Sequence, residues 1–346
     1  MSPTDRGAGP TPDDVGPGPT AREQQEGSTT VTTTVRPASS SRPRRRAGRA
    51  PDAGPVRKVR RLTVVDRVVL TVMVGIPALL VAALIWGPSI ASVVLSFTTW
   101  NGVTPPRAVG TRNYEQIATI YPPFWPAVTH NIVWLLFLLL IATPLGLLLA
   151  VMLDKEIRGT RIYQSVFYLP VVLSLALVGF IWQLIYSQDQ GLINQLTGAD
   201  VNWLGDDSIN LPAVLVAAGW RHVGYIMVLY LAGLKGVDTE IKEAAALDGA
   251  TETQTFFRVV FPTLKPINIV VLVVTVIEGL RAFDIVYIVN KGTNGLELLS
   301  VLITNNILGE ASRIGFGSAL AVILLVISLA FIITYLYQNF RREDAR

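Results

Sequence analysis

The sequence has 346 residues, of which 51% are hydrophobic and only 16% are charged. It is too apolar for an ordinary soluble domain of this length, which favours a lipid bilayer as its solvent. The absence of cysteine excludes disulfide frameworks, thiolate nucleophiles and zinc sites built on cysteine. The net charge of +4 does not indicate a nucleic-acid-binding domain, because residues 1–67 hold 13 of the 29 Lys and Arg residues.

Residues 1–61 form the first predicted region, a disordered basic cytoplasmic tail. They are rich in Gly, Pro, Ser, Thr and Arg, so folding would not bury enough apolar surface to offset the lost chain entropy. The arginines clustered at 42–46 are typical of a solvated tail, and contact with anionic lipid is the alternative. The tail is not predicted to be a cleaved signal, because the apolar span that follows is too long.

Residues 62–346 form the second predicted region, an all-α, polytopic transmembrane domain. A membrane-spanning helix needs about 20 apolar residues. Six windows qualify, at about 68–97, 127–153, 162–188, 208–234, 266–289 and 314–340. Kinked helices are expected because prolines fall in or at the ends of these spans, at positions 77, 88, 144, 170 and 212. A transmembrane barrel would need short alternating segments, whereas these runs are continuous.

The orientation of the spans follows from the Lys and Arg residues of the connecting segments. Both termini and the loops after the second and fourth spans lie on one side and hold 23 of them, whereas the opposite side holds 4. By the positive-inside rule, both termini are predicted to be cytoplasmic.

The longest predicted cytoplasmic loop is 237–265, where local signals indicate two short helices joined by a bend. The first helix is expected to begin with a cap at Asp238 or Thr239. Alanines 244–246 are strong helix formers. Gly249 is expected to end this helix as a C-terminal cap.

The second helix of the loop is marked by the capping-box spacing of Thr251 and Gln254, and Pro262 is expected to end it. The bend between the helices would expose a surface of small residues that another backbone can approach closely. Glu243 offers that surface a charge, and Asp248 is expected to brace the turn. The loop therefore predicts a docking surface for another protein.

The loop resembles the EAA loop of bacterial ATP-binding-cassette (ABC) importer permeases. The matching residues are Glu243-Ala244-Ala245, Gly249 and Val259-x-Phe261-Pro262. Further matches extend the resemblance over about residues 62–340, at 168–170, 182, 191–194, 203–204, 231–234 and 283–284. They point to the sugar-permease branch and imply a MetI/MalF-like permease fold. The family's Thr-x-Gly-Gly-Pro stretch is replaced at 290–295, and the large external insertion of the maltose permease is missing, so maltose specificity is not implied.

The resemblance implies a permease subunit in the bacterial cytoplasmic membrane that translocates a mono- or oligosaccharide delivered by an extracytoplasmic solute-binding protein. Its implied partners are a second permease, forming a heterodimer, and two cytoplasmic ABC ATPases. ATP and Mg²⁺ would bind those ATPases, and no cofactor, metal or catalytic site is expected on this chain. The chain itself has no Gly-x-x-x-x-Gly-Lys-Ser/Thr loop. The residues expected to dock the ATPase are Glu243, Ala244, Ala245, Asp248, Gly249 and Pro262.

Two other classes of function remain open, as does the identity of the solute. Another polar solute, such as a glycerol phosphate, is one alternative to a sugar. An ion-coupled secondary carrier would use Glu278 and Asp284 as coupling sites, but it would leave the EAA loop unexplained. A membrane-embedded enzyme is disfavoured because no nucleophile and base, metal cluster or phosphate loop is visible.

Ionisable residues within the spans are costly in lipid unless they are paired or hydrated. Glu278, Arg281 and Asp284 recur every three residues, which would place them on one side of the fifth span. They are interpreted either as a neutralising cluster that locks helices together or, with Arg221 and His222 of the fourth span, as part of the solute path. The candidate pathway residues are Trp220, Arg221, Tyr225, Glu278, Arg281, Asp284, Asn305 and Asn306.

Overall fold

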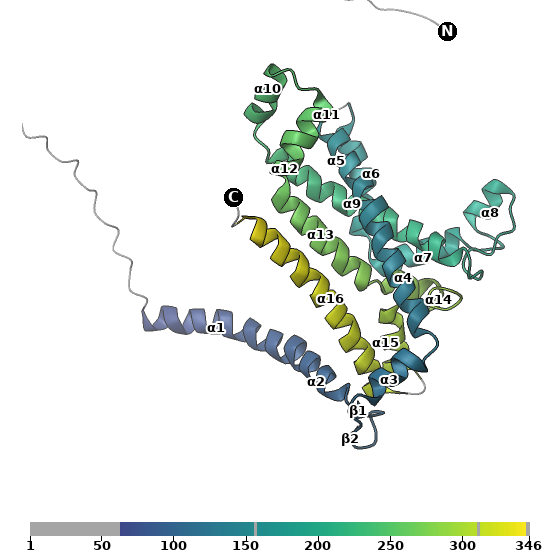
Figure 1. Ribbon diagram of the computed structural model, residues 1–346. Helices are drawn as coiled ribbons and strands as arrows, with labels where there is room; N and C mark the ends of the chain where they lie inside the picture. The colour runs from purple at the N-terminus through teal and green to yellow at the C-terminus, as the bar shows by residue number, and fades with distance from the viewer. Residues whose placement is uncertain (1–62, 156–157, 310–311, 344–346) are drawn as a thin grey trace, which may run out of the picture. The chain divides into compact units, whose positions relative to one another are not determined.

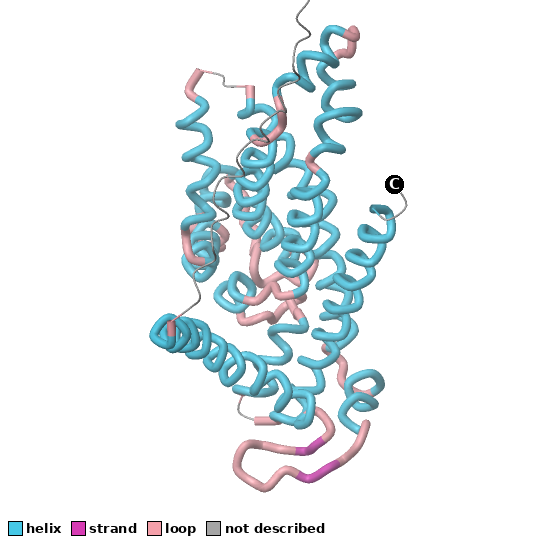
Figure 2. Tube along the Cα trace, turned by 90° about the vertical axis from the view of Figure 1, so that its left-hand side faces the viewer, coloured by secondary structure: helices cyan, strands magenta, loops and turns pink. Residues whose placement is uncertain are grey.

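The computed structural model describes residues 63–155, 158–309 and 312–343. The predicted tail at 1–61 lies outside the described residues. The described part is almost entirely helical, as Figure 2 shows. Its strands β1 (Thr98–Thr99) and β2 (Arg107–Ala108) form one short antiparallel pair. The predicted all-α class is therefore confirmed.

The helices are labelled in Figure 1. In chain order they are α1 (Val64–Val81), α2 (Gly87–Leu95), α3 (Arg112–Thr119), α4 (Phe124–Phe137), α5 (Thr143–Asp154), α6 (Thr160–Val172), α7 (Leu175–Ile185), α8 (Leu192–Thr197), α9 (Asn210–Lys235), α10 (Thr239–Leu247), α11 (Glu252–Thr255), α12 (Phe261–Thr263), α13 (Lys265–Leu280), α14 (Asp284–Asn290), α15 (Leu299–Leu308) and α16 (Ile314–Glu343). Three π-helical segments continue them: η1 (Ala82–Trp86), η2 (Leu138–Ala142) and η3 (Phe256–Val260).

Most of the predicted spans are found as long apolar helices. Among the described residues, four continuous stretches are long and apolar enough to cross a membrane: Val64–Leu95, Phe124–Asp154, Asn210–Lys235 and Ile314–Tyr335. They match the first, second, fourth and sixth predicted spans. The third predicted span, 162–188, is the pair α6 and α7, which are bent by 100° at the break between them.

The predicted fifth span, 266–289, is divided in the structure. α13 ends at Leu280 and α14 begins at Asp284, so the prediction of one continuous helix is wrong. The backbone can leave the helix here because other elements bond its free carbonyls. The Ser300 hydroxyl donates to Ala282 O, and Asn131 Nδ2 lies 3.4 Å from Gly279 O. The total of six spans stays a prediction, because α13 has 16 residues and a full crossing takes about 20.

Each π-helical segment comes two residues before a proline. The prolines are Pro88 after η1, Pro144 after η2 and Pro262 after η3. Proline has no N–H to donate, and its ring clashes with the carbonyl four residues earlier. In all three cases that carbonyl lies in the middle of the π segment, where the wider turn gives it room. The prolines therefore kink these helices without ending them.

Helix α9 lies at the centre of the helical packing. It contacts α4, α5, α6, α7 and α13, and 56% of its most apolar window is buried. At Gly224, an added Cβ would collide with the Phe167 carbonyl of α6. Helices in lipid pack through such close backbone approaches, because the bilayer itself supplies no hydrophobic force between them.

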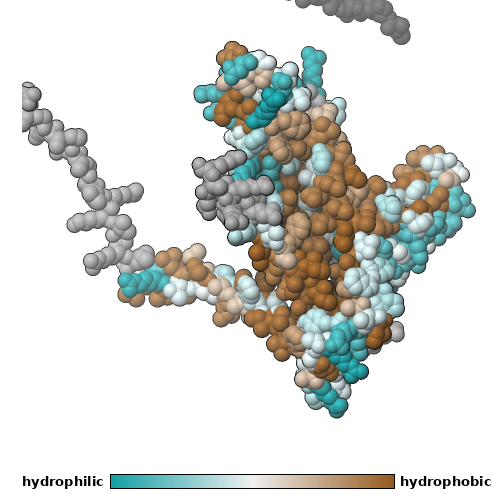
Figure 3. Space-filling model, viewed as in Figure 1, coloured by the Kyte–Doolittle hydropathy of each residue, from teal (hydrophilic) through white to brown (hydrophobic). Residues whose placement is uncertain are grey.

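The surface has an apolar middle and polar ends. Figure 3 shows apolar side chains over α4 and α5, with polar surface at α10 and α11 and at the β1–β2 hairpin. Large apolar side chains exposed in the middle include Leu136, Leu140, Leu145, Leu148 and Met152. No residue of α1 is buried. Exposed apolar surface on this scale is typical of contact with lipid or another membrane protein.

Candidate functional site

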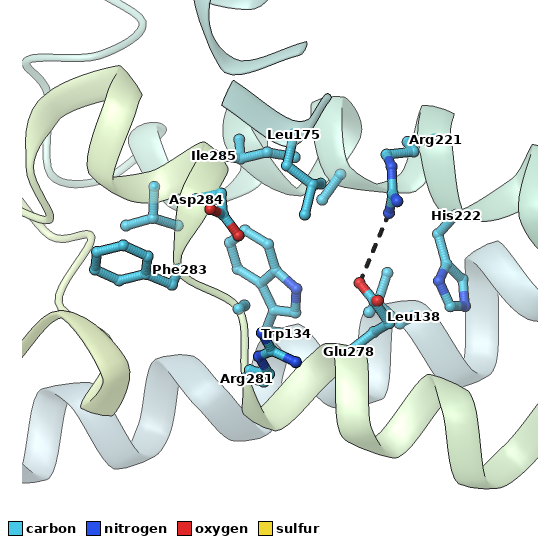
Figure 4. A pocket seen from close by; sticks show the side chains of 13 residues that line it. Trp134, Leu138, Leu175, Arg221, His222, Glu278, Arg281, Phe283, Asp284 and Ile285 are labelled. Atoms are coloured by element: carbon cyan, nitrogen blue, oxygen red, sulfur yellow. Dashed lines mark ion pairs between the residues drawn. The ribbon is translucent and has the colours of Figure 1, made fainter. Parts of the chain in front are cut away.

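A cavity of about 150 Å³ lies at the break between α13 and α14 (Figure 4). It is lined by Trp134, Leu138, Leu175, Ala218, Arg221, His222, Glu278, Arg281, Ala282, Phe283, Asp284, Ile285 and Val286. These residues come from α4, η2, α7, α9, α13, the break itself and α14. One water molecule needs roughly 10–15 Å³ of such space, so the cavity can hold several waters or part of a polar solute.

Four charged side chains reach the cavity. Arg221 Nη1 lies 3.7 Å from Glu278 Oε2, Arg281 is the first residue of the break, and Asp284 is the first residue of α14. Arg221 Nε is buried and has no hydrogen-bond partner among the described residues. With two basic and two acidic groups, the formal charge of the lining sums to zero. Charges at membrane depth that face a cavity typically mark a solute or ion pathway.

A buried histidine completes one wall of the cavity. His222 Nε2 lies 3.2 Å from Thr275 Oγ1 and 3.4 Å from Thr143 Oγ1. The three side chains connect α9, α13 and α5, so the polar atoms of His222 are directed between helices. His222 was predicted to line a solute path together with Arg221, and the structure places both in the lining of the cavity.

The structure brings half of the predicted pathway residues together. The four that line the cavity are Arg221, Glu278, Arg281 and Asp284. Trp220 does not line it: this side chain is 40% exposed and packs edge-to-face against Trp182, with ring centroids 5.9 Å apart. Tyr225 is half-buried beside the α5–α9 packing and is also outside the lining. Whether the four lining residues contact a solute stays a prediction.

The two asparagines among the candidate pathway residues also lie outside the cavity lining. Asn305 is exposed. Asn306 is buried, and its Nδ2 donates to Tyr121 Oη and to Leu302 O. Trp134, by contrast, was missed by sequence reasoning although it lines the cavity and is only 3% exposed. A tryptophan within an apolar span gives no sequence signal that separates a cavity wall from a lipid contact.

The predicted bend in the cytoplasmic loop is present, and residues 238–250 are named the elbow here. Asp238 caps α10 by accepting a hydrogen bond from Glu240 N, as expected. Gly249 follows α10 with φ of 79°, and its N–H donates to Ala246 O. A positive φ is strained for residues with a Cβ, which explains why glycine stands at the turn.

The second predicted helix begins as expected but does not end at Pro262. Thr251 and Gln254 form the capping box. The helical path then continues through η3 and α12 to Thr263, so the prediction that Pro262 ends it is wrong. The physical reason is the π segment, in which Phe261 N–H bonds Phe256 O and accommodates the proline that follows.

The predicted docking residues of the elbow face outward. No residue of α10 is buried. Glu243, Ala244, Asp248 and Gly249 are exposed, and Ala245 is half-buried. In the described part of the chain, Glu243 forms no ion pair. The elbow therefore presents small side chains and an available carboxylate away from the helical packing.

A shared carboxylate joins the elbow to the membrane helices. Asp154 lies at the end of α5. Its Oδ2 is 3.4 Å from Lys242 Nζ of α10, and its Oδ1 is 3.5 Å from Lys235 Nζ of α9. Its side chain is 20% exposed. Next to it, Lys155 donates to the Glu252 carboxylate, which lowers the pKa of Glu252. Sequence reasoning missed Asp154, because no spacing rule connects residues on three separate helices.

An apolar groove of about 760 Å³ lies between α5 and the segment that follows the elbow. Leu147 and Val151 line it from α5, and Phe256 and Phe257 line it from η3. Asp154 and Lys242 lie at the same groove. The ion pairs of Asp154 connect α10 to the ends of α5 and α9 at this groove.

The fold and the two sites define a class of protein: an α-helical membrane protein with an internal cavity lined by charged side chains and an exposed elbow. The model of the family described as "Binding-protein-dependent transport system inner membrane component" matches residues 142–343. The chain belongs to this family. The match covers the elbow and most of the cavity, and it confirms the resemblance to ABC-importer permeases.

Similar proteins extend the comparison over most of the chain. A xylose/arabinose import permease of Haloferax volcanii is 32% identical over 280 residues, covering 78% of this chain and 87% of that protein. An osmoprotective compounds uptake permease of Synechocystis is 32% identical over 281 residues, covering 78% of this chain and 97% of that protein. The crystal structure of a bacterial ABC transporter involved in alginate import shares the fold, with a TM-score of 0.70 and 19% sequence identity. The match covers 80% of this chain and 96% of that chain.

Proposed function

We propose that this chain is the membrane-spanning permease of an ABC importer and that it carries a neutral saccharide through the cavity at the α13–α14 break. One observation supports the proposal most directly. Helix α9 carries Arg221 at the cavity and ends at Lys235, three residues before the elbow begins. A single rigid element therefore connects the candidate solute site to the candidate ATPase contact.

The solute class follows from the cavity's chemistry. A saccharide offers many hydroxyls, which both donate and accept, and charged side chains make the strongest hydrogen bonds to such groups. A glycerol phosphate or another anion would need an excess of basic groups, whereas the lining has two basic and two acidic side chains. A neutral sugar therefore fits better than an anion, and the relative named for xylose and arabinose supports this choice.

The proposed cycle couples the elbow to the cavity. ATP and Mg²⁺ would bind separate cytoplasmic ATPase subunits, whose closure would move the elbow and, through Asp154 and α9, the cavity wall. The cavity would then open alternately to the two sides of the bacterial cytoplasmic membrane. A solute that replaces the Glu278 contact of Arg221 would stabilise one of these states over the other.

The assembly is proposed to contain two permeases, two ATPases and an extracytoplasmic solute-binding protein. The long exposed apolar helix α1 supports a second permease, because such a surface must face either lipid or another membrane protein. A heterodimer is the proposed form.

The function is tested by uptake into proteoliposomes that contain the permeases, the ATPases and the binding protein. Uptake of radiolabelled xylose, arabinose or maltose is expected only when hydrolysable ATP is present at the cytoplasmic face, and glycerol 3-phosphate should not compete. Uptake that continues without ATP but collapses with a proton or sodium ionophore would instead identify an ion-coupled carrier.

Changing Glu278 to Gln is expected to reduce uptake about tenfold or more, because it leaves Arg221 at membrane depth without its anionic partner. The unpaired Arg221 should also lower the yield of folded complex in Glu278→Gln. The double variant Arg221→Gln/Glu278→Gln removes both charges and should restore that yield. Uptake should still be low, because the solute contacts are missing. The measurements are initial uptake rates and the amount of folded complex on size-exclusion chromatography.

The control for this pair is Glu297→Gln. The Glu297 carboxylate lies 3.7 Å from His130 Nδ1, and neither residue lines the cavity, so removing its charge should leave uptake near the wild-type rate. Full recovery of uptake in the Arg221/Glu278 double variant would mean that the two charges only lock helices together, and the pathway assignment would be wrong.

A further inference from the structure

A second cleft lies on the opposite side of the chain from the elbow, between the β1–β2 hairpin, α3 and the start of α16. It encloses about 300 Å³, and its walls include Trp100, Asn101, Asn113, Gln116, Arg313 and Phe316. It shares no lining residue with the cavity at the α13–α14 break. By the charge rule for loops this side is extracytoplasmic, so an imported solute arrives there.

The walls of this outer cleft are held in place before any ligand binds. Asn113 is buried, and its Nδ2 donates to Ser96 O at 2.8 Å and to Thr98 O at 2.9 Å. Gly315 N–H donates to Trp100 O at 3.2 Å, which ties the hairpin to α16. A preorganised site loses less entropy on binding than a flexible loop does.

The cleft contains several polar groups with unused hydrogen-bonding capacity. Among the described residues, Trp100 Nε1, the Gln116 amide and the Arg313 guanidinium have no hydrogen-bond or ion-pair partner. Asn101 Oδ1 accepts three hydrogen bonds from the hairpin loop, so its Nδ2 is available as a donor. The Arg313 guanidinium lies 4.0 Å from the centroid of the Phe316 ring, which fixes its direction.

We propose that the outer cleft is a second saccharide-binding site, which holds the solute at the extracytoplasmic face before it enters the cavity. An indole ring offers a flat apolar surface to the C–H face of a sugar, while amide and guanidinium groups bond its hydroxyls. The volume is at the lower end of the range for small-molecule sites. This inference rests on the proposed function, since it requires a sugar as the solute.

A protein partner is the less suitable occupant of the same cleft. A stable protein interface takes roughly 800 Å² from each partner, whereas this cleft is a small hollow with room for one sugar unit or one side chain. Its uncommitted groups are three donors and one amide that both donates and accepts, which suits hydroxyls. Contact with the binding protein is therefore kept as an outcome of the test.

The test uses the complete importer in lipid nanodiscs, without its binding protein. Maltose, trehalose, arabinose and xylose serve as probes, and binding is followed by saturation-transfer difference NMR. Trp100→Ala and Gln116→Leu are each expected to weaken binding of the recognised sugar about five- to tenfold, as expected for one lost stacking or hydrogen-bonding contact. Trp125→Ala is the control, because Trp125 is 59% exposed and does not line the cleft.

Three results would overturn the inference. One is wild-type importer that takes up a sugar from the set but gives no binding signal in nanodiscs. The second is a signal that both variants leave unchanged. The third, measured after the binding protein is added to the same nanodiscs, is a loss of its capture in both variants with sugar binding intact, which would identify a protein contact. ATP-driven uptake by the wild type is measured in parallel, so failure of the proposed function is recognised separately as uptake of none of the sugars.

Discussion

Replacing Gly249 with proline is expected to abolish both uptake and co-purification of the ATPase, while the permease still inserts into the membrane. Proline fixes φ near −65° and has no N–H. Gly249 has φ of 79°, and its N–H bonds Ala246 O. The substitution therefore disrupts the elbow, and α10 can no longer present Glu243 and Ala244 in one orientation. Uptake assays and affinity purification of the tagged permease measure the two effects.

Gly198 provides a closely matched control for this change. It has φ of 68°, its N–H donates to Asn194 O, and an added Cβ would meet open space, as at Gly249. Gly198→Pro therefore imposes the same backbone conflict at the end of α8, far from the elbow in the chain. It should leave ATPase binding intact. Loss of ATPase binding in both variants would show a general folding defect, and normal binding in Gly249→Pro would rule out the docking role of the elbow.

Changing Asp154 to Asn is expected to uncouple ATP hydrolysis from transport. Asp154 is the one carboxylate, among the described residues, that lies within ion-pair distance of both Lys235 and Lys242. Removing its charge should reduce uptake about tenfold, while the ATPase still binds because the surface of α10 is unchanged. Hydrolysis should no longer respond to sugar-loaded binding protein. The measurement is the number of ATP molecules hydrolysed per sugar taken up.

A cysteine pair tests whether the connection through Asp154 is mechanical. The chain has no cysteine of its own, so Asp154→Cys/Lys242→Cys introduces the only two thiols. A short thiol-to-thiol cross-linker should restore coupled uptake to this double variant. Asp206→Asn is the control for Asp154→Asn, because Asp206 accepts hydrogen bonds from its neighbour Ser208 in the loop before α9. If Asp154→Asn transports normally, or the cross-link restores nothing, the role of Asp154 is disproved.

The sequence predicted the features that depend on local chemistry. The caps at Asp238 and Thr251 and the turn at Gly249 follow from the side chains of a few neighbouring residues, and the structure contains all three. The long spans were also found, because an apolar run of about 20 residues has few alternatives in lipid.

Features that depend on contacts between distant segments were not predicted. The break after Leu280 lies within the stretch predicted as one span, and it is stabilised by Asn131 and Ser300, which lie about 150 residues before it and about 20 after it. The junction at Asp154 and the wall residue Trp134 likewise depend on how helices pack. The three-residue spacing of Glu278, Arg281 and Asp284 predicted that they lie on one side of a continuous helix. In the structure all three line the cavity, and the helix is interrupted between them.

The interruption of the fifth predicted span also limits how far a movement of α13 is transmitted to α14. Only residues 281–283 separate α13 from α14, and rotation about the dihedral angles of so short a segment is a common form of hinge. α13 can therefore swing at its N-terminal end while α14 keeps its packing on α7. A pull applied at the elbow would in this way reshape the part of the cavity next to α13 and leave the part formed by α7 and α14 in place.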